Sequence, residues 1–177
     1  MGIDWGFGSS KTAFVVTEFV DGICRIIYAK EFANQSVDEM INHAYRLIRK
    51  YNLDNWENKT FVDGSSPGNI RSLKNAISGT NETIDYHLLV KKATEDKRPL
   101  DLYMQIVPVN FSTDGKQMLD KLKKYISKKW MAIDPDAFPE LLTELRVATA
   151  NEEMQLQKNV FTHDLLDSLR LSMCYYK

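Results

Sequence analysis

Four aspartates stand where folding could bring their carboxylates together. Asp4 lies in an alternating apolar segment, residues 2–7, which predicts a β-strand. Asp63 ends a second such segment, and Asp164 and Asp167 open a helical pattern near the end of the chain. An ionised Asp in so apolar a strand needs a counter-charge or a bound cation. Acids in a first strand, at a later strand end and on a C-terminal helix predict a metal-dependent nuclease.

The chemistry of phosphodiester hydrolysis assigns a role to each acid. Two Mg²⁺ or Mn²⁺ ions about 3.5–4 Å apart activate a water and stabilise charge on the attacking and leaving oxygens. Hard divalent ions prefer oxygen ligands. We expect Asp4 to bridge the two ions, Asp63 to bind one and Asp164 the other. Asp167 follows Asp164 at i+3 and can point to the same helix face, and His163 could orient water or contact phosphate.

Each acid alone also has an ordinary structural explanation. Backbone amides could satisfy Asp4, a turn before Gly64 suits Asp63, and any helix N-terminus favours an acid such as Asp164. The hypothesis therefore depends on the four residues together.

Composition sets the broad class. The chain has 177 residues and a net charge of −1, so no global basic field indicates nucleic acid. Cys24 and Cys174 predict two buried reduced thiols. We expect an intracellular protein, since neither a leader nor a membrane-spanning segment is visible. A core strand directly after Met1 predicts one domain, residues 1–177, excised from a longer chain.

The order of the elements predicts an α/β fold. Segments 2–7, 12–19 and 23–32 read as an antiparallel meander, and strands at 60–63 and 102–107 follow. Helices are predicted after Ser36, from Pro67 to about Ser78, and from Ser112, Pro139 and Thr162. We expect a mixed five-stranded sheet, order 3-2-1-4-5, with strand two antiparallel and helices on both faces. The first strand should be central.

A basic cluster interrupts this pattern between residues 80 and 100. Lys91, Lys92, Lys97 and Arg98 are candidates for sequence-tolerant contacts with DNA phosphates.

Several stretches carry a family resemblance. They are Gly2-Ile3-Asp4-Trp5-Gly6, Phe61-Val62-Asp63-Gly64-Ser65-Ser66-Pro67-Gly68, Pro108-Val109-Asn110-Phe111, Glu144-Leu145-Arg146 and Asp164-Leu165-Leu166-Asp167-Ser168-Leu169. In order and spacing they resemble the ribonuclease-H-like superfamily, and within it the nuclease domain of viral large terminase subunits. One departure is that His163 stands where the family often has the first of two consecutive acids. The primary ligand is therefore open between Asp164 and Asp167.

The resemblance implies an endodeoxyribonuclease that cuts concatemeric viral DNA during genome packaging, using two Mg²⁺ or Mn²⁺ ions. Its implied partners are double-stranded DNA, an ATPase motor domain in the full-length protein, the small terminase subunit and the portal, in the cytoplasm of the infected host cell and away from membranes. No GxxxxGK[ST] phosphate loop occurs in the sequence, so the motor domain is not part of this chain.

Two alternatives stay open. The segment Gly6 to Thr12 resembles the first phosphate hairpin of actin-like and sugar-kinase-like nucleotide-binding proteins, although the chain is short for their two lobes. The other alternative is a non-catalytic domain that binds DNA or a packaging partner. Saturable Mn²⁺ binding would separate the enzyme from the second alternative.

Overall fold

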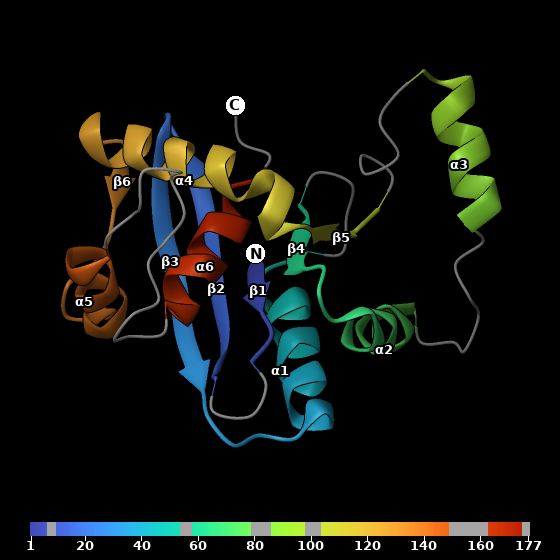
Figure 1. The fold of residues 1–177 in the computed structure, drawn as a ribbon, viewed down its shortest axis with the longest axis horizontal. Helices are drawn as coiled ribbons and strands as arrows, with labels where there is room; N and C mark the ends of the chain where they lie inside the picture. Colours follow the sequence, from blue (N-terminus) through green and yellow to red (C-terminus); the bar gives the residue numbers. More distant parts are fainter. Residues whose placement is uncertain (7–9, 54–57, 79–85, 98–103, 149–162, 175–177) are drawn as a thin grey trace.

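One mixed sheet organises the protein. The computed structural model describes residues 1–6, 10–53, 58–78, 86–97, 104–148 and 163–174. Its six strands are arranged in the order β5-β4-β1-β2-β3-β6 (Figure 1). Their bounds are β1 Gly2–Asp4, β2 Thr12–Val20, β3 Ile23–Phe32, β4 Thr60–Asp63, β5 Ile106–Val109 and β6 Met131–Ala132. Strands β1, β4 and β5 run parallel, β2 is antiparallel to β1 and β3, and β6 pairs with β3 in parallel.

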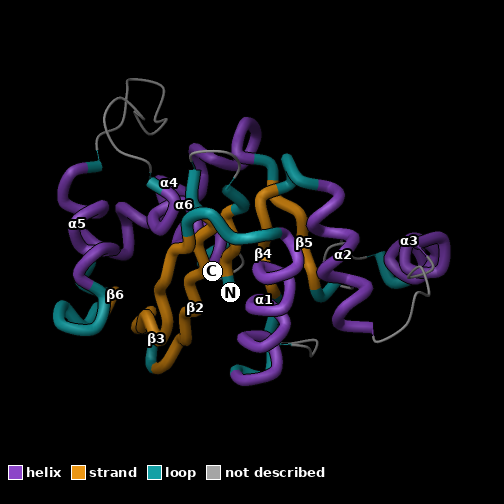
Figure 2. Tube along the Cα trace, turned by 90° about the horizontal axis from the view of Figure 1, so that it is seen from below, coloured by secondary structure: helices purple, strands orange, loops and turns teal. Residues whose placement is uncertain are grey.

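Helices cover both faces of the sheet (Figures 1 and 2). Helices α1 (Val37–Lys50) and α2 (Pro67–Ser78) pack on one face, against β1, β2 and β4. Helices α4 (Phe111–Ser127), α5 (Pro139–Val147) and α6 (Asp164–Ser172) form the core of the other face. Helix α3 (Tyr86–Glu95) lies at the periphery, away from the sheet, in both views.

The structure confirms the predicted α/β class, the central first strand and the order of the five expected strands. It adds β6, whose two residues are too few to produce a period-two pattern. Strand β1 ends at Asp4, earlier than predicted. Strand β5 lies at 106–109, against a predicted 102–107 of which residues 102 and 103 lie outside the described residues. Pro108 is tolerated there because β5 is an edge strand.

Most helix starts agree with their local signals. Ser36 and Glu39 form the expected capping box, and α2 begins at Pro67 as predicted. Helix α4 begins at Phe111 and not after Ser112, because the Asn110 side chain accepts a hydrogen bond from the Ser112 amide at 2.9 Å and caps the helix.

Helix α6 packs directly on β1. A Cβ atom at Gly2 would lie 1.9 Å from the Ser168 carbonyl oxygen and 2.6 Å from the Ser172 nitrogen. The Ser168 hydroxyl donates a hydrogen bond to the Gly2 carbonyl oxygen at 2.9 Å. Only glycine permits this approach, which brings the helix with Asp164 onto the strand with Asp4.

Two further expectations concern the cysteines and the membrane. Among the described residues Cys24 and Cys174 form no disulfide; Cys24 is buried as predicted, whereas Cys174 is only partly buried. Burial raises the pKa of each thiol to about 12. No helix in the described part of the chain has the length and apolar character needed to cross a bilayer.

Candidate functional site

Asp4 and Asp63 lie side by side at the centre of the sheet. The parallel register pairs Ile3 with Val62, and its next step puts Asp4 beside Asp63. Ile3 and Val62 face the core under α1, so the residues that follow them face the opposite side, which α6 and α4 cover. Asp4 is 9% exposed and Asp63 is partly buried. Both are the last residues of parallel strands, where sites in α/β sheets gather.

Asp164 reaches this region from the first turn of α6. It is 2% exposed, and both of its carboxylate oxygens accept hydrogen bonds from the segment that leads into β2. The Ser10 hydroxyl donates to Oδ1 at 3.1 Å and the Lys11 amide donates to Oδ2 at 3.2 Å. The orientation of the carboxylate is therefore held from outside its own helix.

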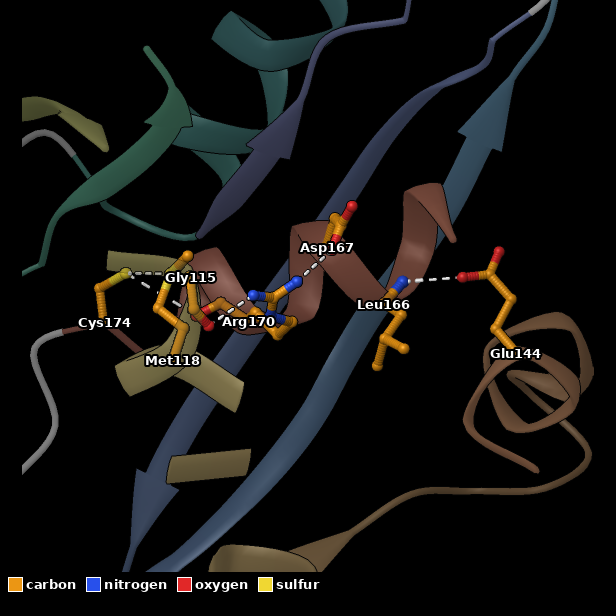
Figure 3. Close-up of polar contacts among 7 residues, drawn as sticks. All are labelled: Gly115, Met118, Glu144, Leu166, Asp167, Arg170 and Cys174. Carbon is orange, nitrogen blue, oxygen red and sulfur yellow. Dashed lines mark hydrogen bonds and ion pairs between the residues drawn. The ribbon is translucent and has the colours of Figure 1, made fainter. Parts of the chain in front are cut away.

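Asp167 has a different environment. Its Oδ1 pairs with Arg170 at 2.6 Å, and the same guanidinium donates to the Gly115 carbonyl oxygen of α4 at 2.6 Å (Figure 3). The guanidinium also lies over the Phe111 ring, 5.1 Å from its centroid. Both charged side chains are 5% exposed. Arg170 thus neutralises Asp167 and links α6 to α4.

Asp63 and His163 also take part in local structure. The Asp63 carboxylate accepts hydrogen bonds from the amide, at 3.0 Å, and the hydroxyl of Ser65, an Asx turn at the end of β4. His163 is the N-cap of α6 and is 2% exposed. Its carbonyl oxygen accepts the Asp167 amide at 2.8 Å, but its side chain does not cap the helix.

The structure brings Asp4 and Asp63 together on the face against which the helix of Asp164 and Asp167 packs. Within the described ranges, no three His, Cys, Asp or Glu side chains lie close enough to hold a metal ion. The oxygen donors of Asp4, Asp63 and Asp164 have the chemistry that Mg²⁺ and Mn²⁺ prefer. Each carboxylate has lone pairs beyond those that accept its present hydrogen bonds, so Asp63 and Asp164 could bind a cation while keeping these bonds.

Sequence reasoning gave no role to three charged residues beside Asp164. Glu144 of α5 accepts the Leu166 amide at 2.8 Å (Figure 3). Burial raises the pKa of Glu144 to about 7, and the negative charges of Glu31 and Asp164 add to this shift. The Lys11 ammonium pairs with Glu31, and this hydrogen bond raises the pKa of Lys11. Glu144 belongs to the Glu144-Leu145-Arg146 stretch of the family resemblance, but no spacing pattern connects it with Lys11 and Glu31, which lie far away in the sequence.

The basic cluster is only partly described. Lys91 and Lys92 are exposed on α3, and Lys97 follows the helix, also exposed. Lys91 lies 3.8 Å from Glu95, one turn along α3, in a solvent-exposed pair. Arg98 lies outside the described residues.

Several solved structures share this arrangement of strands and helices. The large terminase nuclease from the thermophilic phage G20c is 15% identical with a TM-score of 0.66, covering 99% of this chain and 81% of that one. The same nuclease with bound magnesium is 17% identical, with a TM-score of 0.65 and coverage of 99% and 80%. The nuclease domain of g2p, the large terminase of bacteriophage SPP1, with bound Mn, is 14% identical, with a TM-score of 0.55 and coverage of 97% and 82%. At identities this low, the structural similarity shows a shared fold, the ribonuclease-H-like fold, and no more than that.

No protein-family model matches the sequence, and a comparison with curated proteins finds no match.

Proposed function

We propose that this chain is the nuclease domain of a viral large terminase subunit and hydrolyses DNA phosphodiester bonds with bound Mg²⁺ or Mn²⁺. The observation that carries the proposal is the placement of Asp4 and Asp63 on adjacent parallel strand ends, under the helix that begins with Asp164. The match of 97–99% of the chain to terminase nuclease domains, two of them solved with Mn or magnesium, supports it.

Asp4, Asp63 and Asp164 would hold the ions, Asp4 between the other two. Bound divalent ions supply an activated water and stabilise the charge that develops on the phosphate oxygens. The chain's own contribution is orientation: Ser10 and Lys11 hold the Asp164 carboxylate, and the pairing of β1 with β2 and β4 fixes the backbone of Asp4.

Between the two acids of α6, we assign the ligand role to Asp164. Asp167 was an equal candidate on spacing alone, but its charge is already compensated by Arg170 in a buried pair. Recruiting Asp167 to a cation would leave that guanidinium buried without its counter-ion, which is unfavourable. We retain Asp167 as a support for α6 and His163 as a residue that orients water or phosphate.

The finer proposals concern substrate and context. The substrate is double-stranded DNA, cut endonucleolytically, with Lys91, Lys92, Lys97 and Arg98 contacting phosphates. In its full-length context the domain would follow an ATPase motor and act with the small terminase subunit and the portal, cutting concatemeric DNA in the infected host cytoplasm. Neither the nucleotide-binding alternative nor a purely DNA-binding role is favoured, because the similar structures are nucleases.

A plasmid assay tests the proposal. Wild-type protein should nick and then linearise supercoiled plasmid with Mn²⁺ or Mg²⁺, and EDTA should abolish cleavage. Asp4→Asn should lose the activity and melt at or above the wild-type temperature, because it removes a buried charge and, with it, a carboxylate oxygen that would hold the ions. The matched control is Asp21→Asn, an exposed turn residue with φ of 51°, where Asn is equally suited. Cleavage by Asp4→Asn at the wild-type rate would refute the assignment of Asp4 as a residue that holds the ions.

A further inference from the structure

Helices α4 and α5 hold helix α6 at three points. At its C-terminal end the Lys121 ammonium of α4 donates to the carbonyl oxygens of Met173 and Cys174, each at 3.0 Å. In its middle, Arg170 donates to the Gly115 carbonyl oxygen of α4. At its N-terminal end, Glu144 of α5 accepts the Leu166 amide. Figure 3 shows α6 between the α5 contact on one side and the α4 contacts on the other.

The N-terminal contact replaces a missing cap. Leu166 is the third residue of α6, and the amide at that position normally bonds to the side chain of the N-cap residue. Here the N-cap residue is His163, which makes no such bond. Glu144 supplies the acceptor from a different helix, and its carboxylate also lies at the positive end of the helix dipole.

The position of this cap connects it to the acidic site. Leu166 follows Asp164 by two residues, so the contact fixes the same helical turn that presents the Asp164 carboxylate. Glu144 is half-buried and lies on α5 where this helix packs against α6. Apolar residues of both helices belong to one core. An acceptor held this firmly limits how far the first turn of α6 can rotate or fray.

We propose that Glu144 is a positioning residue for Asp164: by capping the Leu166 amide from α5, it sets the direction in which the first turn of α6 presents that carboxylate to a divalent cation. This inference rests on the proposed function only for the identity of the cation. Disturbing residues that orient metal ligands typically lowers affinity 10- to 100-fold. Because Glu144 acts through the backbone, we expect the lower end, about tenfold.

The test compares four variants by two measurements. Glu144→Ala removes the acceptor, Glu144→Leu removes it while keeping side-chain volume, and Glu144→Gln keeps an uncharged acceptor. Glu140→Ala, an exposed acid one turn earlier on α5, is the matched control. The first measurement is hydrogen exchange of the Leu166 amide without metal, and the second is Mn²⁺ affinity by calorimetry at pH 8.5, above the pKa of Glu144.

We expect the Ala and Leu variants to exchange the Leu166 amide faster and to bind Mn²⁺ about tenfold more weakly. Glu144→Gln should stay near wild type in both measurements, and Glu140→Ala should equal wild type. If one apolar variant fails to fold, the other decides. Equal losses in Gln and Ala variants would show a charge effect and overturn positioning, as would faster exchange with unchanged affinity.

The two proposals fail differently. Wild-type protein that binds no Mn²⁺ would refute the proposed function and, with it, any role of Glu144 toward a cation. Wild-type protein that binds Mn²⁺ as tightly as Glu144→Ala would refute the inference alone.

Discussion

Replacing Gly2 by alanine tests the packing that brings the acids together. The new Cβ would lie 1.9 Å from the Ser168 carbonyl oxygen, whereas ordinary contacts begin at 3.4 Å. The helix must therefore move by about 1.5 Å, or the central strand must bow by as much. Ser168 and Ser172 present backbone atoms there, so no side-chain rotation relieves the overlap. Overpacking of this kind costs about 1–3 kcal/mol, and three atoms within 3 Å place Gly2→Ala at the upper end.

Urea and thermal denaturation measure the effect. A loss of about 3 kcal/mol in a domain of this size lowers the melting temperature by about 6–12 °C. The control is Gly68→Ala in the first turn of α2, where a Cβ meets nothing within 4 Å. It should be neutral or stabilising by up to about 1 kcal/mol.

A second readout separates stability from site geometry. Below its melting temperature Gly2→Ala should still bind Mn²⁺ more weakly than wild type, because α6 carries Asp164. A free energy of unfolding within 1 kcal/mol of wild type would show that α6 does not pack on β1 as closely as described.

The remaining predictions concern a buried ion pair, a histidine and the basic cluster. Arg170→Met should lower the free energy of unfolding, measured by urea denaturation, by about 3–5 kcal/mol, because the Asp167 charge stays buried without the Arg170 guanidinium. Adding Asp167→Leu should recover much of this loss, and additive losses in the double variant would contradict the prediction. Burial lowers the pKa of His43, and the positive charges of Arg46 and Lys30 lower it further. The imidazole therefore binds a proton more tightly in the unfolded chain than in the folded one, and stability should fall as the pH drops below about 6.5. His43→Gln should flatten that slope in melts across pH 5–8, and an unchanged slope would assign it to another group. Exchanging Lys91 and Lys92 for Glu should weaken DNA binding at low salt and reduce its salt dependence without altering the melting temperature; equal affinity across a salt series would leave the cluster as solvated surface.

Local patterns predicted the centre of the sheet. Ile3 and Trp5 alternate with glycine or aspartate, and segments 12–19 and 60–63 are rich in β-branched and aromatic residues. The helix between β1 and β4 required these two strands to run parallel. The adjacency of Asp4 and Asp63 followed from that topology. The capping box at Ser36 and the hairpin at Asp21 were equally local and equally predictable.

Contacts between distant segments could not be predicted in this way. The Glu144 cap and the bond from Arg170 to Gly115 join helices whose relative position depends on the whole fold. Only the i, i+3 spacing of Asp167 and Arg170 could have been predicted to form an ion pair. That prediction would have favoured Asp164 over Asp167 as the metal ligand. The N-cap at Asn110 was missed because Ser112, two residues on, is also a good cap.

The packing of α6 on β1 has a consequence for the synthesis of the protein. The bond between Ser168 and Gly2 joins residues 166 positions apart, so β1 must wait until α6 has been made before the two can pack. Until the ribosome has released α6, the nascent chain lacks both the helix that packs over β1 and the helical turn that carries Asp164. Such long-range closure is slow and comes late. If the site cuts DNA, it can therefore do so only after translation of the domain has finished.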